Sequence, residues 1–214
     1  MKTDARRFAL LSNGSGFGRA VLQALLRRNR APALLVLPEY PPARPVRGEL
    51  LDPGARSRFG ELPASIQLDY APRAAQAKLA ARLRHGRFDW LLVACWPYLL
   101  EREVCESVRR CALNLHPSML PAYRGPDPIG AQLDSGERNP GVSLHLLSPD
   151  FDRGDIVVQA MLPGSKRPRH RQAFEAHCAT LGAQLFSDLL DNPEKGVNPI
   201  AQESITTREY HLNQ

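Results

Sequence analysis

Residues 8–18 read Phe-Ala-Leu-Leu-Ser-Asn-Gly-Ser-Gly-Phe-Gly, a short apolar run followed by a glycine-rich turn. Phe8 to Leu11 predicts a buried strand, and the apolar residues after the turn repeat every four positions, as on one side of a helix. These helical residues are Val21, Leu22, Leu25 and Leu26. A second apolar run, Ala33 to Leu37, completes a strand–turn–helix–strand order. This order predicts an α/β fold with a doubly wound, mostly parallel sheet.

The rest of the chain continues the alternation of strands and helices. Further strands are expected at Ile66–Leu68, Trp90–Cys95, Cys111–Leu115, Gly141–Leu147 and Ile156–Met161, and helices at Arg73–Arg84, Glu101–Arg109, Pro128–Ser135 and from about Arg171. Pro38 to Ser65 is rich in Pro, Arg and Gly and has no clear period, so we expect a long loop there with at most one short helix. We predict one domain over residues 1–190, followed by a C-terminal tail over 191–214 that forms no separate domain.

The composition of the 214 residues suits one globular domain, because a hydrophobic share of 43% is enough for a core. The chain contains no run of about 18 apolar residues, so no membrane helix is predicted, and its N-terminus lacks the pattern of a signal peptide. The four cysteines have no CxxC spacing, so we expect neither a metal site nor a disulfide framework. We therefore expect a cytoplasmic location. The net charge of +6 is compatible with an anionic substrate or nucleic acid. The basic residues are spread in small clusters, however, so we expect neither a nucleic-acid nor a membrane partner.

An Asn and a His lie at the end of the predicted strand Cys111–Leu115. Asn114 and His116 are two positions apart, and such residues of an extended strand point to the same side. Open α/β sheets bind ligands at the carboxyl ends of their strands. A carboxamide N–H can stabilise an oxyanion, and an imidazole can act as a general acid or base. A buried polar pair satisfied by the backbone is the common alternative. His145, on an alternating strand, is interpreted as a hydrogen-bonded structural residue.

The residues around this pair extend the pattern. Residues 114–125 read Asn-Leu-His-Pro-Ser-Met-Leu-Pro-Ala-Tyr-Arg-Gly, residues 141–143 read Gly-Val-Ser, and residues 152–156 read Asp-Arg-Gly-Asp-Ile. This series resembles that of the 10-formyltetrahydrofolate-dependent formyltransferases. Their pattern is roughly Asn-x-His-x-Ser-Leu-Leu-Pro-x-Tyr/Trp/Phe-Arg/Lys-Gly, then Thr-Gly-Val-Thr, then Asp-x-Gly-x-Ile. Mild departures are Met119, where the family has Leu, Asn139-Pro140, which replaces the polar pair before Gly141, and Ser143, where the family has Thr.

The resemblance implies a formyltransferase catalytic domain with a Rossmann-like fold, in which Asn114, His116 and Asp152 are catalytic. In such enzymes an amine attacks the formyl carbon of the co-substrate 10-formyltetrahydrofolate. Asn114 and a protonated His116 would stabilise the tetrahedral oxyanion, and Asp152 would orient the imidazole and favour its charged form. The pterin ring would lie in an apolar slot between the loop after the fourth strand and the loop before Asp152. The residues expected to bind it are Trp96, Pro97, Tyr98, Leu100, Ser148, Pro149, Asp150 and Phe151.

Two segments are candidates for binding the acceptor. The glycine-rich turn departs from the G-x-G-x-x-G fingerprint, because Arg19 stands where the third glycine is needed, so no nicotinamide site is expected. The turn is similar to the Asn-Gly-Ser loop that holds the substrate phosphate in glycinamide ribonucleotide formyltransferases, and a plain strand-to-helix turn is the equal alternative. The candidate acceptor-binding residues are Asn13, Gly14, Ser15, Tyr123, Arg124 and Gly125.

The resemblance leaves the acceptor open. Tyr-Arg-Gly at 123–125 looks more like methionyl-tRNA and sugar-nucleotide formyltransferases, whereas the length suits a glycinamide ribonucleotide formyltransferase. Methionyl-tRNA formyltransferases carry a further C-terminal domain, for which we see no room after the last predicted helix. We expect a formyltransferase acting on the amine of a small acceptor, sugar-linked or phosphorylated. The alternatives are a methionyl-tRNA formyltransferase-like protein lacking that domain, a hydrolase that deformylates the folate, and a non-catalytic folate-binding relative.

Overall fold

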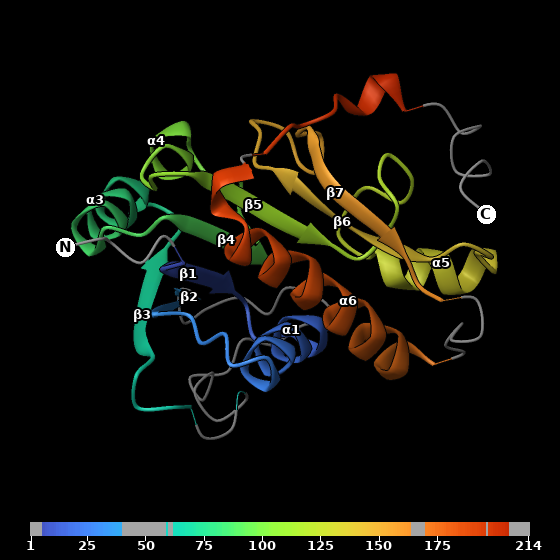
Figure 1. Cartoon of the computed structure of the whole chain (residues 1–214), viewed down its shortest axis with the longest axis horizontal. Helices are drawn as coiled ribbons and strands as arrows, with labels where there is room; N and C mark the ends of the chain where they lie inside the picture. The colour runs from blue at the N-terminus through green and yellow to red at the C-terminus, as the bar shows by residue number, and fades with distance from the viewer. Residues whose placement is uncertain (1–5, 40–58, 60–61, 164–169, 196, 206–214) are drawn as a thin grey trace.

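A seven-stranded sheet forms the centre of the fold (Figure 1). The computed structural model describes residues 6–39, 59, 62–163, 170–195 and 197–205. The strands are β1 (Phe8–Ser12), β2 (Leu34–Glu39), β3 (Gln67–Pro72), β4 (Trp90–Ala94), β5 (Cys111–His116), β6 (Gly141–Leu146) and β7 (Ile156–Met161). Their order is β3-β2-β1-β4-β5-β6-β7, with parallel pairing from β3 to β5 and antiparallel pairing of β6 and β7. The predicted doubly wound, mostly parallel sheet is confirmed.

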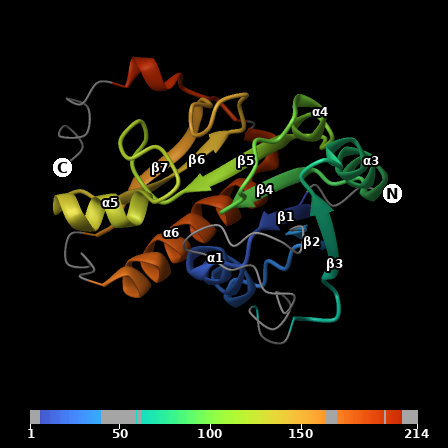
Figure 2. The ribbon, with the colours of Figure 1, turned by 180° about the vertical axis from the view of Figure 1, so that it is seen from behind.

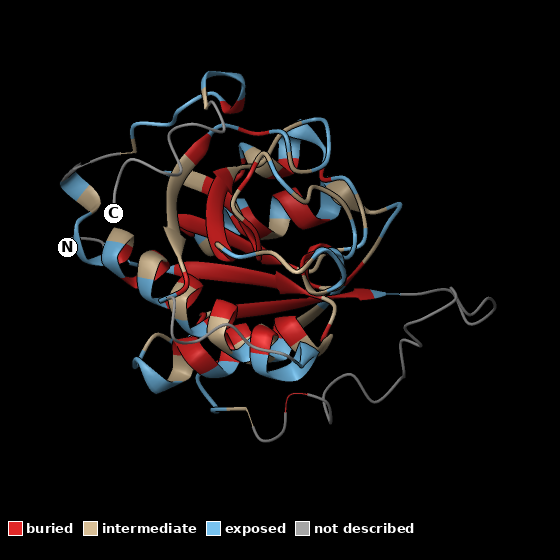
Figure 3. Ribbon diagram, turned by 90° about the vertical axis from the view of Figure 1, so that its right-hand side faces the viewer, coloured by how far each residue is buried: buried red, intermediate tan, exposed pale blue. Residues whose placement is uncertain are grey.

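Helices cover both faces of this sheet. One face is covered by α1 (Gly16–Arg27) and α6 (Arg171–Asp191), which lie side by side, and the other by α3 (Gln76–Gly86) and α4 (Arg102–Cys105) (Figure 2). The remaining helix, α5 (Pro128–Ser135), contacts α6. Figure 3 shows the strands as a buried layer between helices whose outer sides are exposed. The fold therefore has the three layers that a doubly wound sheet requires.

Alternate residues of β1 face two separate apolar cores. Phe8 and Leu10 belong to the core under α1 and α6, and Ala9 and Leu11 to the core under α3. Phe186 of α6 is fully buried and packs edge-on against Phe8, with 5.1 Å between the ring centroids. Burying such a side chain contributes about 1.5–3 kcal/mol, so this contact helps to hold α6 against the sheet.

A glycine lets α6 pack directly on β5. A Cβ atom on Gly182 would lie 2.5 Å from both methyl carbons of Leu115, which is closer than packed atoms approach. Leu115 stands between Asn114 and His116. The close contact therefore fixes the strand that carries both candidate catalytic residues.

The helix predicted at Glu101–Arg109 is shorter than expected, because α4 ends at Cys105. The Ser107 hydroxyl donates to the Val104 carbonyl at 2.6 Å, which satisfies the last turn locally. The chain then leaves the helix to enter β5. Local apolar spacing predicted a helix, but the short distance to the next strand limits its length.

The structure describes the predicted loop and the predicted tail only in part. In the predicted loop Pro38–Ser65, residues 40–58 and 60–61 lie outside the described residues. In the predicted tail, Ile200 and Ile156 exchange two backbone hydrogen bonds of 2.8 Å, so the tail pairs with the start of β7. The tail also forms short 3-10 turns, η2 (Pro193–Lys195) and η3 (Gln202–Ser204).

None of the described helices is long and apolar enough to cross a membrane.

Candidate active site

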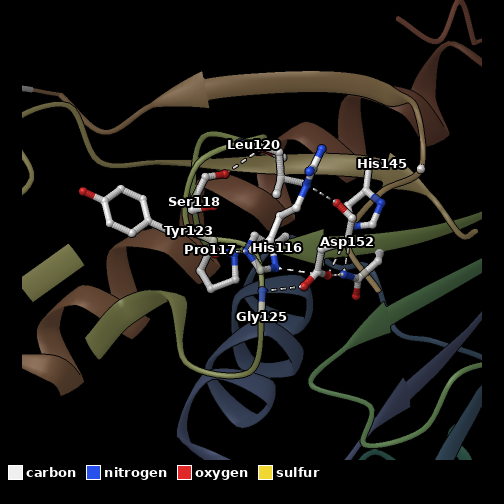
Figure 4. A network of polar contacts seen from close by, with 12 residues as sticks. His116, Pro117, Ser118, Leu120, Tyr123, Gly125, His145 and Asp152 are labelled. Atoms are coloured by element: carbon white, nitrogen blue, oxygen red, sulfur yellow. Dashed lines mark hydrogen bonds and ion pairs between the residues drawn. The ribbon is translucent and has the colours of Figure 1, made fainter. Parts of the chain in front are cut away.

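Three polar side chains meet at the C-terminal end of β5. Asn114 Nδ2 lies 3.3 Å, and His116 Nδ1 lies 3.4 Å, from the same atom, Oδ1 of Asp152. Figure 4 shows His116 and Asp152 directed at each other, with Asp152 in the turn between β6 and β7. The structure therefore brings together the groups that the strand spacing and the resemblance indicated. Their catalytic roles stay predictions.

The Asp152 carboxylate is bound on both oxygens. Its Oδ2 accepts the backbone N–H of Gly125 at 3.0 Å. Burial alone would raise the pKa of Asp152, but the hydrogen bond and charge of His116, together with the Gly125 N–H, outweigh it and lower that pKa. The backbone φ of Asp152 is +56°, a left-handed conformation that residues other than glycine adopt only when their surroundings hold them.

His145 joins the same network from β6. It pairs with Asn114 across the antiparallel β5–β6 ladder and is 2% exposed. Its Nδ1 lies 2.8 Å from the Leu146 carbonyl, which can only accept, so Nδ1 carries the hydrogen. Burial lowers the pKa of His145 to about 4, so the ring is neutral at pH 7. Its Nε2 then accepts from Asn114 Nδ2 at 3.0 Å, and its 3.8 Å approach to Asp152 is no ion pair at that pH.

These neighbours fix the orientation of the Asn114 carboxamide. Its Nδ2 faces two acceptors, Nε2 of His145 and Oδ1 of Asp152. The opposite orientation would direct the carboxamide oxygen at a lone pair and at a carboxylate, so the orientation with Nδ2 toward both acceptors is favoured. The N–H donors of Asn114 therefore point into the space that it shares with His116 and Asp152.

Both ring nitrogens of His116 face oxygen atoms. Nε2 lies 2.9 Å from the Tyr123 carbonyl, and Nδ1 faces Asp152. A ring with hydrogens on both nitrogens could donate to both neighbours at once. Since His116 is 4% exposed, a ligand that bonds to this ring must exchange with one of these two partners.

Residues 123–125 form a loop around the network. Tyr123 and Gly125 have positive φ angles of +57° and +112°, and the Tyr123 hydroxyl donates to Glu137 at 2.8 Å, beyond the end of α5. The Arg124 guanidinium donates to the Asp152 carbonyl at 3.2 Å and to Gln202 Oε1 at 3.0 Å. The side chain of Arg124 and the N–H of Gly125 are therefore engaged with the network, while their predicted contact with the acceptor stays a prediction.

A model of the formyl transferase family matches residues 6–188 of the chain. The chain belongs to this family. A curated relative, the methionyl-tRNA formyltransferase of Coprothermobacter proteolyticus, is 28% identical over 157 residues, which cover 72% of this chain and 48% of the relative. The corresponding protein of Chloroflexus aggregans is 38% identical over 118 residues, covering 53% of this chain and 37% of the relative. The chain thus spans about half or less of these two curated relatives.

Solved structures of formyl transferases share the fold. Glycinamide ribonucleotide transformylase 1 from Symbiobacterium toebii superposes with a TM-score of 0.62 at 19% identity, covering 91% of this chain and 93% of that one. A 4-N formyltransferase from Francisella tularensis gives a TM-score of 0.62 at 13% identity, covering 93% of this chain and 74% of that one. At these identities the likeness establishes the fold alone.

The two loops predicted to bind folate in this formyl transferase adjoin one apolar cluster. Trp96 and Leu147 both pack against the core that includes Leu100. Leu99 and Phe151, on the same two loops, are 42% and 54% exposed. Each of the two loops thus presents one exposed apolar side chain.

The polar groups of these loops are mostly used internally. Ser148 Oγ donates to the Asp150 carbonyl at 2.6 Å. The rings of Tyr98 and Trp96 pack edge to face, with 5.9 Å between their centroids. Pro97, Pro149 and Asp150 are exposed. The Trp96 indole nitrogen is buried without an acceptor among the described residues, so the loop holds one unused donor.

The Asn13-Gly14-Ser15 turn satisfies its own backbone. Asn13 Oδ1 accepts from the Ser15 N–H at 2.9 Å, and Ser15 Oγ caps α1 by accepting from Gly18 N–H at 3.3 Å. A carboxylate lies against the same helix terminus, because a Cβ on Gly16 would lie 2.3 Å from Oε2 of Glu175. The N-terminus of α1 thus faces a negative group of the chain itself. The acceptor contacts predicted for Asn13, Gly14 and Ser15 stay a prediction. In the described part of the chain, no group of three His, Cys, Asp or Glu residues could hold a metal ion.

Proposed function

We propose that the protein transfers the formyl group of 10-formyltetrahydrofolate to the amine of a small acceptor. The observation that carries this proposal is the meeting of three side chains at one atom: the Asn114 amide and the His116 ring both lie within 3.4 Å of Asp152 Oδ1. A hydrogen-bond donor, an imidazole and a carboxylate in one small, half-buried space are the groups that acyl transfer needs.

The reaction forms one bond and breaks another at the formyl carbon. The acceptor amine adds to that carbon, and the tetrahedral oxyanion accepts hydrogen bonds from Asn114 and protonated His116. Asp152 holds the His116 ring and relays a proton from the amine through water. The intermediate then expels N10 of tetrahydrofolate, which takes up a proton. Asp152 keeps its contact with His116 Nδ1, so the formyl oxygen would replace Asp152 as the acceptor for Asn114 and the Tyr123 carbonyl as the acceptor for His116 Nε2.

We propose that the folate binds over the two apolar loops. The ring would lie against the residues predicted from the sequence, Trp96, Pro97, Tyr98, Leu100, Ser148, Pro149, Asp150 and Phe151. The exposure of Phe151 and Leu99 supports this assignment, because a bound ring would cover both side chains.

For the acceptor we propose a small amine, sugar-linked, that does not place a phosphate at the N-terminus of α1. The Glu175 carboxylate beside Gly16 supports this choice, since it would repel an anion there. A second candidate is methionyl-tRNA. It is supported by the curated relatives, which carry the name methionyl-tRNA formyltransferase.

The test is turnover of 10-formyltetrahydrofolate with a panel of amines: amino-sugar nucleotides, glycinamide ribonucleotide, amino acids and methionyl-tRNA. The Asn114→Ala and Asp152→Ala variants run beside the wild type, and each should lower the rate about 100- to 1,000-fold. Turnover without any amine would indicate a hydrolase. Folate binding without turnover, unchanged in both variants, would leave a non-catalytic relative.

A further inference from the structure

Gln202 bonds to the candidate active site from outside the segment that the family model matches. It lies in η3, is 1% exposed, and follows the matched residues 6–188 in the chain. Its Nε2 donates to the Asp152 carbonyl at 2.9 Å and to the Gly154 carbonyl at 2.8 Å. Its Oε1 accepts from Arg124 Nε at 3.0 Å and from a second guanidinium nitrogen. One buried side chain thus joins two loops.

The chemistry of this contact is specific to glutamine. Both N–H groups of the carboxamide donate, and its oxygen accepts from a cation, so every polar atom of the side chain is used. Glutamate keeps the acceptor for Arg124 but has no donors for the two carbonyls. Alanine loses the contacts to both carbonyls and to Arg124. The Asp152 carbonyl keeps its bond from Arg124, but the Gly154 carbonyl loses its Gln202 donor, which is costly for a buried group.

The loop that Gln202 binds has a backbone conformation that must be held in place. Asp152 has a φ of +56°, and its carbonyl is held by Arg124 and by Gln202. Its carboxylate is bound to Gly125, in the loop that also carries Arg124. Loss of Gln202 would therefore remove one of the contacts that hold the strained residue, and also the contact that holds Arg124 in the loop that faces it.

The position of Gln202 is itself fixed. Ile200, two residues earlier, exchanges two backbone hydrogen bonds of 2.8 Å with Ile156, at the start of β7. The turn 152–154 therefore lies between β6, β7 and the paired tail.

We propose that Gln202 is a positioning residue, which acts on the reaction through Asp152 and Arg124. This inference rests on the proposed formyl transfer.

The experiment compares wild type, Gln202→Ala and Gln202→Glu, with Glu203→Gln, an exposed neighbour in η3, as the matched control. Because misplacing a catalytic group by about 1 Å can cost on the order of 100-fold, we expect kcat to fall about 10- to 100-fold in both Gln202 variants. The KM for folate should change little, and the control should behave as wild type. Thermal unfolding and folate binding show whether each variant is folded.

A second readout does not depend on activity. The NMR chemical shifts of the His116 ring nitrogens, measured at one fixed pH, report the contact of this ring with Asp152, and they should change in the Gln202 variants but not in Glu203→Gln. If wild type fails to turn over folate, the proposed function fails, and these chemical shifts still test the positioning role. Folded Gln202 variants with wild-type kcat and unchanged His116 chemical shifts would overturn it. Should Gln202→Ala not fold, Gln202→Glu, which keeps the size and the Arg124 contact, serves in its place.

Discussion

Replacing His145 with Gln should remove much of the acid sensitivity of the folded state. Burial, aided by the nearby charges of His116 and Arg124, lowers the pKa of His145 from 6.5 to about 4, although Asp152 and the Leu146 carbonyl act in the opposite direction. As the pH falls through about 6.5, the unfolded chain takes up a proton at this ring, whereas the folded protein does so only near pH 4. Stability is therefore lost as the pH falls between these two values.

The size of the effect follows from the two pKa values. At about pH 5 the unfolded ring is mostly protonated and the folded ring mostly neutral, which corresponds to roughly 2 kcal/mol of lost stability relative to neutral pH. Asp152 adds nothing to this loss between pH 6.5 and pH 4. Its pKa is lowered from 3.8, so its contribution to stability is lost only at more acidic pH. His145→Gln keeps an acceptor for Asn114 but has no group that titrates here.

The assay is urea unfolding followed by the fluorescence of the two tryptophans, at about pH 7.5 and about pH 5. Wild type should lose about 2 kcal/mol more than His145→Gln between the two conditions. His85→Gln, an exposed change on α3, is the control and should follow wild type. An equal loss in wild type and His145→Gln would refute the reasoning, because the buried ring would then not be the group that takes up the proton.

Three further substitutions test the packing and charge around the site. In Gly154→Ala the new Cβ would lie 1.8 Å from the Leu146 carbonyl oxygen, so the turn must move, and turnover should fall on the order of 100-fold; full activity would contradict this. Gly182→Ala should push α6 off Leu115 and lower the free energy of unfolding by about 1–3 kcal/mol, and a wild-type urea midpoint would show that the helix adjusts freely. Glu175→Gln removes the negative charge beside the N-terminus of α1 and should lower the free energy of unfolding by about 0.3–1 kcal/mol, whereas an unchanged urea midpoint would disconnect Glu175 from that helix end.

The sequence predicted the strand that carries the site better than the partners of that strand. The two-residue spacing of Asn114 and His116 placed both on one side of β5, as the structure has them. Alternation along β6 showed only the direction in which His145 points. That it points at Asn114 depends on the antiparallel register of β5 and β6, which is a long-range property of the sheet. Gln202 lies in a polar segment without any period, so no local pattern could single it out.

The boundaries of the elements were set by neighbours as well as by propensity. α4 is one turn long because the chain must enter β5 a few residues later. β3 extends to Pro72 because it pairs with β2 as far as Glu39. Apolar spacing predicts that an element exists, while pairing and chain length decide where it ends.

The bond between Gln202 and Asp152 also has a consequence for the order in which the protein is made. The two residues are 50 positions apart, and Gln202 is the later one to leave the ribosome. The sheet and its covering helices can pack as they are synthesised, because their residues come earlier. The turn that holds Asp152 can be closed only once this late segment has emerged and paired with β7. The sheet of a nascent chain would therefore be folded before the chain could transfer a formyl group, because the turn that holds Asp152 is completed last.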